Sequence, residues 1–182
     1  LDSLKAHPEW SDQIVSFLWA SDVTDIFRIQ AIRNDKGLET VGISHCFVNA
    51  KGTEAYGQTF MNESLSLRRL ILIAVSFFEA FSKEKIIVID DFGQLLHPYV
   101  LTHIVEIFHA NDMESQLIVV DCNPALLQKD LMRKDSIWFA EKGEESSTEF
   151  VSLSDFRGIK AKQSIYDGYL QGVFGALPIE SD

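Results

Sequence analysis

The sequence predicts an α/β fold: a mainly parallel β-sheet flanked by helices, with a small antiparallel β-meander near the N-terminus. Val/Ile runs at 86–89 and 117–120 alternate with helical patterns, as is typical of parallel strands buried on both faces. Earlier in the chain, three β-type segments are separated by turns that contain glycine, as in a meander of hairpins. We expect one domain, residues 1–182, in which 1–61 form a helix and the meander and 62–182 form the parallel part.

The N-terminal part is predicted to form one helix and three strands. Residues 12–20 (DQIVSFLWA) place apolar side chains at a spacing that suits a short helix. Apolar and polar residues alternate over 24–33, which is typical of a half-buried strand. After the turn NDKG, further strands are expected over 41–50 and 54–61.

The rest of the chain alternates helices and strands. A helix over 65–81, capped by Asn62 or Ser64, carries apolar residues on nearly every face beyond Arg69 and should be mostly buried. The elements expected after it are a strand at 85–90, a helix at 99–110, a strand at 115–121, a short helix near 124–132 and a strand at 136–142. The last ones are a solvated turn at 143–147, a strand at 148–156 that pairs with the strand before it, and a glycine-interrupted helix or loop at 166–177.

Composition argues against several classes of protein. A net charge of −11 does not fit the broad basic surface of a nucleic-acid or anionic-membrane binder, although it does not exclude a local basic patch. The longest apolar run breaks at Glu79 after about ten residues, short of the roughly 20 that span a membrane. No signal peptide is visible, and Cys46 and Cys122 match no metal or disulfide pattern, so a cytoplasmic location is expected. Because the chain begins Leu-Asp rather than Met, we expect further residues upstream of Leu1.

Two adjacent carboxylates end the strand at 85–90. Asp90 and Asp91 follow its Val/Ile run, and Asp121 ends the strand at 115–121. Ligands bind outside the carboxyl ends of strands in open parallel sheets, and Mg²⁺ takes one or two carboxylates while keeping several waters. Asp90 and Asp91 are equally consistent with a plain structural explanation, in which they are polar residues at the start of a solvated loop. A phosphohydrolase or phospho-acceptor domain that uses a carboxylate pair would also explain it.

The order of several segments is more specific than any one of them. NESLSLRRLILIAV, KIIVIDDFGQLLHP, SQLIVVDCNPALL, DSIWFAEK, TEFVSLSDF and GYLQGVFGALP follow one another within residues 55–178. In this order they resemble the C-terminal half of ABC-type heads among the P-loop NTPases. The likeness is greatest to bacterial AAA-like ATPases associated with abortive infection and phage defence, distant relatives of SMC and DNA-repair heads. GYLQGVFGALP matches a C-terminal pattern typical of that family, and the meander would be an insertion.

The resemblance implies roles for the residues at the start of the predicted helix. Ser64 falls where the signature serine touches the γ-phosphate of a nucleotide held by a second head. Ser66 lies in the same signature-like turn. Arg68 and Arg69 match the arginine pair of the family. ATP is therefore an expected ligand of the complete protein.

The resemblance also implies roles for the residues after the strand at 85–90. Asp90 would be the Walker B aspartate that orders Mg²⁺ through water, and Asp91 would polarise the attacking water. His97 would end the loop that crosses the dimer interface, and Cys122 occupies the position of the switch histidine. Mg²⁺ is thus the second expected cofactor.

The sequence departs from the family at several of these positions. Ser66 stands where the family has Gly, so its Cβ would hinder a close approach of the backbone to phosphate. Asp91 stands where the family has Glu and is one methylene shorter, which should weaken hydrolysis because a general base must reach its water. Cys122 cannot donate as an imidazole does. No GxxxxGK[ST] motif occurs in the 182 residues, so the chain by itself should not bind ATP tightly.

The same residues have plain structural explanations. Ser64 would serve as a helix N-cap, and His97 before Pro98 as the start of a helix. Arg68 and Arg69 would be solvated residues of a first helical turn, although cations there oppose the helix dipole.

Other conspicuous side chains are assigned to packing. His45 and Cys46 lie in a strand without a partner motif, and Cys122 would be an inert, partly buried thiol. The aromatic residues expected in the core are Phe77, Phe78 and Phe81 on the predicted helix and Tyr166, Tyr169 and Phe174 near the C-terminus.

Two functions from different classes follow. The first is the C-terminal part of an ATP-binding and ATP-hydrolysing head, weak in hydrolysis, that acts as a nucleotide-driven switch. It would form a homodimer through the head and work with an effector protein. The second is a pseudo-ATPase that serves as a protein-interaction scaffold without nucleotide chemistry. A GxxxxGK[ST] loop upstream of Leu1 would favour the first.

Overall fold

The computed structural model describes residues 2–128, 131–143, 147–157 and 164–177. Parts of the segments predicted at 124–132 and 143–147 lie outside these residues, as does Pro178 of the C-terminal motif. The chain divides into two units, residues 1–121 and 122–182. In the described part of the chain, no helix is long and apolar enough to cross a membrane.

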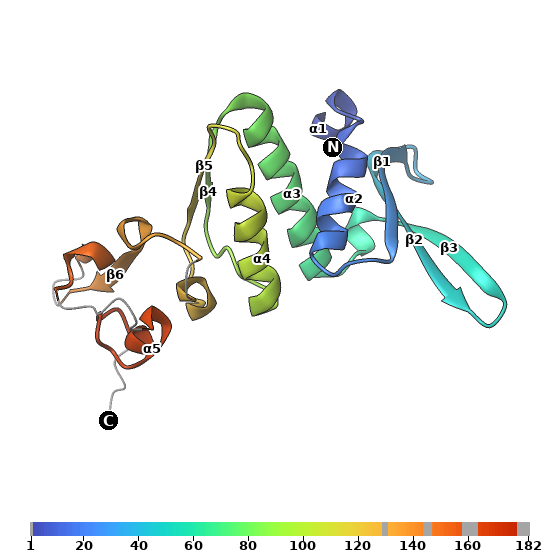
Figure 1. Cartoon of the computed structure of the whole chain (residues 1–182). Coiled ribbons are helices and arrows are strands. Elements are labelled where there is room, and N and C mark those ends of the chain that lie inside the picture. The colour runs from blue at the N-terminus through green and yellow to red at the C-terminus, as the bar shows by residue number, and fades with distance from the viewer. Residues whose placement is uncertain (1, 129–130, 144–146, 158–163, 178–182) are drawn as a thin grey trace. The chain divides into compact units, whose positions relative to one another are not determined.

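The first unit joins a β-meander to helices that pack on a parallel pair of strands (Figure 1). Its elements are α1 (Asp2–Ala6), α2 (Trp10–Ala20), β1 (Ile26–Arg33), β2 (Glu39–Asn49), β3 (Gly52–Thr59), the 3₁₀ turn η1 (Phe60–Asn62), α3 (Leu65–Lys83), β4 (Ile86–Ile89), α4 (Pro98–His109) and β5 (Gln116–Val119). β1, β2 and β3 pair in that order in antiparallel register, and β4 pairs with β5 in parallel register. The predicted meander is confirmed, while α1 was not predicted.

The core of the first unit is centred on α3. This helix contacts α2 and β4, and Figure 1 shows it between them. Phe77 of α3 is 1% exposed, and its ring centroid lies 5.0 Å from that of Phe108 and 6.1 Å from that of Phe17. The aromatic spacing on the predicted helix therefore does mark core residues.

The second unit is a small hairpin with short helical turns. Its elements are the 3₁₀ turns η2 (Pro124–Leu127), η3 (Lys134–Ser136) and η4 (Leu153–Asp155), the strands β6 (Trp138–Lys142) and β7 (Thr148–Ser152), and the helix α5 (Ile165–Leu170). Phe139 of β6 stacks on Phe174 and Tyr169, with ring centroids 5.3 and 5.8 Å apart. These two aromatic side chains thus pack against the hairpin, as expected.

The mixed α/β class is confirmed, but its parallel part is smaller than expected. β6 pairs antiparallel with β7, because only a short connection separates the two strands. In the described residues, parallel pairing is limited to β4 and β5. Of the segment predicted as a short helix near 124–132, the described residues 124–127 form the 3₁₀ turn η2.

Candidate functional site

The chain turns sharply after β4, at the two adjacent carboxylates. Asp90 Oδ1 accepts a hydrogen bond from Asp91 N at 3.0 Å. Asp91 has a φ of 49°, a left-handed conformation that Asp adopts more readily than most residues. The side chain of Phe92 is fully buried, and its N–H donates to Val120 O at 3.1 Å. The loop that begins at Asp90 is therefore anchored in the core immediately after the two carboxylates.

A carboxylate from the neighbouring strand holds the same loop. Asp121, which follows β5, accepts a hydrogen bond from Gly93 N through Oδ2. The two strand ends that the sequence singled out therefore meet in one place. A Cβ added at Gly93 would lie 2.5 Å from Asp121 Oδ2 and 2.7 Å from Leu101 Cδ2. Glycine is needed here because the loop passes so close to α4 and to Asp121.

Gly93→Ala is expected to lower the free energy of unfolding by about 1–3 kcal/mol, since the new methyl overlaps Leu101 and Asp121. Gly57→Ala is the matched control: its Cβ would meet only Ile43 O, at 3.7 Å. The control should stay within about 0.5–1 kcal/mol of the unsubstituted protein. Urea denaturation of the three proteins makes the comparison, and equal losses would contradict the packing argument.

The first two turns of α3 lie against this loop. Ser66 Oγ donates to Leu95 O at 2.8 Å. Arg69 Nη2 donates to Asp90 O at 2.9 Å and to Asp91 O at 2.6 Å. The structure therefore brings the start of α3 together with the loop after β4, which the sequence separates by about twenty residues. Arg69 contacts the loop, whereas Arg68 Nη1 points to Met61 Sδ at 3.9 Å.

Two of the predicted site residues cap helices. Ser64 is the N-cap of α3, where its Oγ accepts from Leu67 N at 3.2 Å. His97 is the N-cap of α4, where its Nδ1 accepts from Tyr99 N at 3.2 Å, with Pro98 in the first turn. Both expected structural roles are confirmed. Their roles toward a nucleotide or a second head stay predictions.

Asp90 offers a ligand for a divalent cation. It is exposed at the carboxyl end of β4, and only its Oδ1 accepts the loop N–H described above. Among the described residues, no three His, Cys, Asp or Glu side chains gather to hold a metal ion. The role of Asp90 toward Mg²⁺ therefore stays a prediction.

Cys122 differs from expectation. It is the first residue of the second unit and carries an exposed free thiol, not a partly buried one. The segment that follows β5 is an open connection before η2, which leaves the side chain in solvent.

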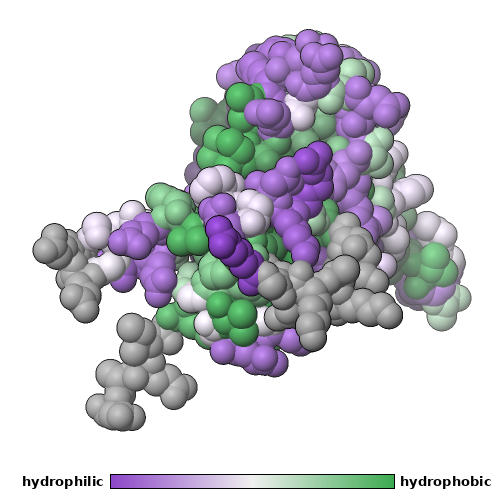
Figure 2. Space-filling view, turned by 60° about the vertical axis from the view of Figure 1, so that its left-hand side comes forward, coloured by the Kyte–Doolittle hydropathy of each residue, from purple (hydrophilic) through white to green (hydrophobic). Residues whose placement is uncertain are grey.

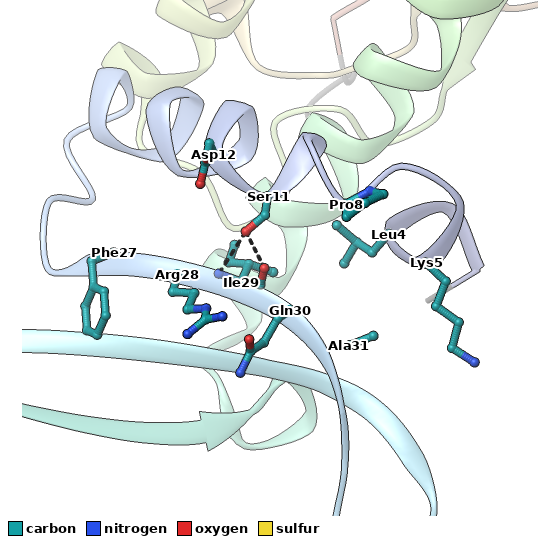
Figure 3. Close-up of a pocket in the computed structure, with 10 residues that line it drawn as sticks. All are labelled: Leu4, Lys5, Pro8, Ser11, Asp12, Phe27, Arg28, Ile29, Gln30 and Ala31. Atoms are coloured by element: carbon teal, nitrogen blue, oxygen red, sulfur yellow. Dashed lines mark hydrogen bonds between the residues drawn. The ribbon is translucent and has the colours of Figure 1, made fainter.

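One hollow of the first unit lies elsewhere. It measures about 530 Å³ and is bordered by α1, α2 and the outer edge of β1 (Figure 3). Ser11 Oγ donates to Ile29 O there and accepts from Ile29 N at 3.4 Å, so α2 covers part of the strand edge. No predicted site residue lines this hollow.

His45 is buried, as expected of a packing residue, but it also has two carboxylate partners that the sequence did not predict. Its Nδ1 lies 2.8 Å from Asp25 Oδ2, and its Nε2 lies 2.8 Å from Glu63 Oε1. No local motif signals this cluster, because the partners are 20 and 18 residues away in the sequence. The meander brings them together.

Comparison with known proteins gives structural likeness only. No protein-family model matches the sequence, and no curated protein matches it significantly. A structure from work on ATP-driven dimerization and DNA-stimulated activation of SMC ATPases aligns with a TM-score of 0.57 and 14% identity, over 82% of this chain and 86% of that one. The Smc head bound to the C-winged helix domain of ScpA aligns with a TM-score of 0.50 and 13% identity. That alignment covers 84% of this chain but 45% of the other. The chain therefore resembles these SMC ATPase structures in fold.

Proposed function

We propose that this chain is the C-terminal part of an ATP-binding and ATP-hydrolysing head, which dimerises with a second head when nucleotide is bound. The observation that carries this proposal is the hydrogen-bonded junction between α3 and the loop after β4. Ser66 and Arg69 donate to backbone carbonyls of that loop. A nucleotide contacted by the start of α3 would therefore act on the same rigid unit that carries Asp90 and Asp91.

The geometry of this junction supports the proposed roles. The N-terminus of α3 presents Ser64 and the positive end of a 19-residue helix, which favours an anion such as a γ-phosphate. Asp90 would hold Mg²⁺ through water, and this cation would neutralise phosphate charge. Asp91 would orient the attacking water. Its short side chain supports weak hydrolysis.

An uncovered sheet face supports the participation of a second lobe. Four apolar side chains on one face of the β4–β5 pair are 50–66% exposed: Ile86, Val88, Ile118 and Val120. Parallel strands are normally covered on both faces. Apolar surface also reaches the exterior in several places on the face shown in Figure 2. We propose that polypeptide outside residues 1–182 covers the β4–β5 face and supplies the phosphate-binding loop.

ATP turnover by a head that contains both this chain and the phosphate-binding loop tests the proposal. Asp90→Asn is expected to lower Mg²⁺-dependent turnover at least about tenfold, because it removes the anionic ligand. Asp35→Asn, in the exposed turn between β1 and β2, is the control and should leave turnover unchanged. The 182-residue chain by itself should show no ATP binding by calorimetry. Equal turnover in Asp90→Asn and the control would refute the assigned role.

A pseudo-ATPase scaffold is the second candidate. Ser66 favours it, because its side chain is tied to Leu95 O of the same chain and adds a Cβ where a phosphate would approach. A complete head that dimerises without Mg²⁺-dependent turnover would support this candidate. In either case we propose a cytoplasmic homodimer with an effector protein as partner, in the setting of phage defence.

A further inference from the structure

One buried titratable cluster lies outside the site described above. His45 is 3% exposed and lies between the carboxylates of Asp25 and Glu63, each 2.8 Å from a ring nitrogen. The Glu63 side chain is as buried as the ring, whereas the Asp25 side chain is 52% exposed. The Tyr56 ring stacks on the imidazole, with centroids 4.8 Å apart and planes 5° apart.

The geometry favours a doubly protonated ring. A neutral imidazole has one N–H and one lone pair, so it can donate to only one of two ionised carboxylates. An imidazolium donates to both, and the face of Tyr56 also favours a cation. Burial lowers the pKa of His45, but the hydrogen bonds to Asp25 and Glu63 outweigh burial and raise it above its ordinary value.

The three partners of His45 come from different parts of the first unit. Asp25 precedes β1, and Tyr56 of β3 is the register partner of His45 on β2. Glu63 immediately precedes Ser64, the N-cap of α3. Among the described residues, Asp25, Tyr56 and Glu63 are the titratable groups seen to contact the ring. The ring therefore links the meander to the start of the helix.

We propose that His45 is a positioning residue: as an imidazolium, it ties Glu63 to the meander and thereby fixes the first turn of α3. Its relevance to ATP rests on the proposed function, because that turn is the end of α3 assigned to the γ-phosphate. The link between His45 and the turn does not depend on nucleotide.

The link should weaken as the pH rises. Because the pKa of His45 is higher in the folded than in the unfolded chain, the folded state binds more protons above the ordinary histidine pKa of about 6.5. The stabilisation is thus complete below about pH 6.5 and is lost as the pH rises through the folded pKa.

Nuclear magnetic resonance of the 182-residue chain tests the charge state. Both ring nitrogens of His45 should carry protons at pH 6, and their ¹⁵N shifts should titrate at higher pH than those of an ordinary histidine. A neutral His45 ring at pH 6 would overturn the proposal. This measurement needs no variant, so it remains decisive even if a substitution at His45 prevents folding.

Amide hydrogen exchange tests the coupling to α3. In His45→Gln, the amide of Leu67, which donates to Ser64 Oγ, should exchange about fivefold faster or more at pH 6.5. The amide of Leu101, which donates to His97 O in α4, should be unchanged. In the unsubstituted chain, Leu67 protection, corrected for the intrinsic rate, should fall toward that of the variant as His45 loses its proton.

Two further variants make the comparison specific. Glu63→Gln keeps the shape of the side chain but removes its charge, so His45 should titrate at lower pH than in the unsubstituted chain. His103→Gln, on the exposed side of α4, should leave both the titration of His45 and the exchange of Leu67 unchanged. Unchanged Leu67 exchange in folded His45→Gln would overturn the positioning role. Absent ATP turnover with both effects present would reject the proposed function but not this inference.

Discussion

Replacing Phe77 by Ala is expected to lower the free energy of unfolding by about 3–5 kcal/mol. Phe77 is 1% exposed, and its ring packs against aromatic rings from two other helices, those of Phe17 on α2 and Phe108 on α4. Truncation removes the burial of the ring and leaves a cavity that the three surrounding helices cannot close completely.

Leu72→Ala provides the control for this substitution. Leu72 lies on the same helix but is 56% exposed, so its truncation should cost no more than about 0.5 kcal/mol. Chemical denaturation followed by circular dichroism measures both variants. A loss below 1 kcal/mol for Phe77→Ala would mean that α3 is not the centre of the core, and the position of the loop after β4 would then need another explanation.

The periodic elements of the first unit were predictable because their signals are local. The pattern over 65–81 and its cap at Ser64 predicted α3, which spans Leu65–Lys83. The glycine-containing turns predicted the meander, and the Val/Ile runs predicted β4 and β5. Each of these inferences needs only a few neighbouring residues.

The contacts that build the candidate site were not predictable in the same way. Arg68 and Arg69 are adjacent and both match the family pattern, but successive helix residues point about 100° apart, so only one faces the loop. The partners of His45 depend on how the meander folds back on itself. Sequence reasoning therefore identified the segments of the site, while the side chains that join them came from tertiary structure.

Replacing Arg69 by Met is expected to lower the free energy of unfolding by about 1.5–3 kcal/mol, the usual range for hydrogen bonds made by a charged group. Nη2 of the guanidinium donates to two successive carbonyls, Asp90 O and Asp91 O, and the thioether of Met has no N–H to replace these bonds. The bonds also hold Asp91 in its left-handed conformation, which costs free energy when unsupported.

The positions at which amide protection is lost distinguish this explanation from a general effect of removing a positive charge. In Arg69→Met, amide exchange should accelerate most at Phe92, Gly93 and Gln94, whose N–H groups bond within the loop or to the end of β5. Arg33→Met removes an equal charge from a side chain that is 75% exposed, and it should leave these amides protected and stability within about 1 kcal/mol. If both variants accelerate the loop amides equally, Arg69 does not hold the loop. The hydrogen bond of Ser66 and the packing of Phe92 would then hold the loop against α3. A nucleotide at the start of α3 would be coupled more weakly to Asp91.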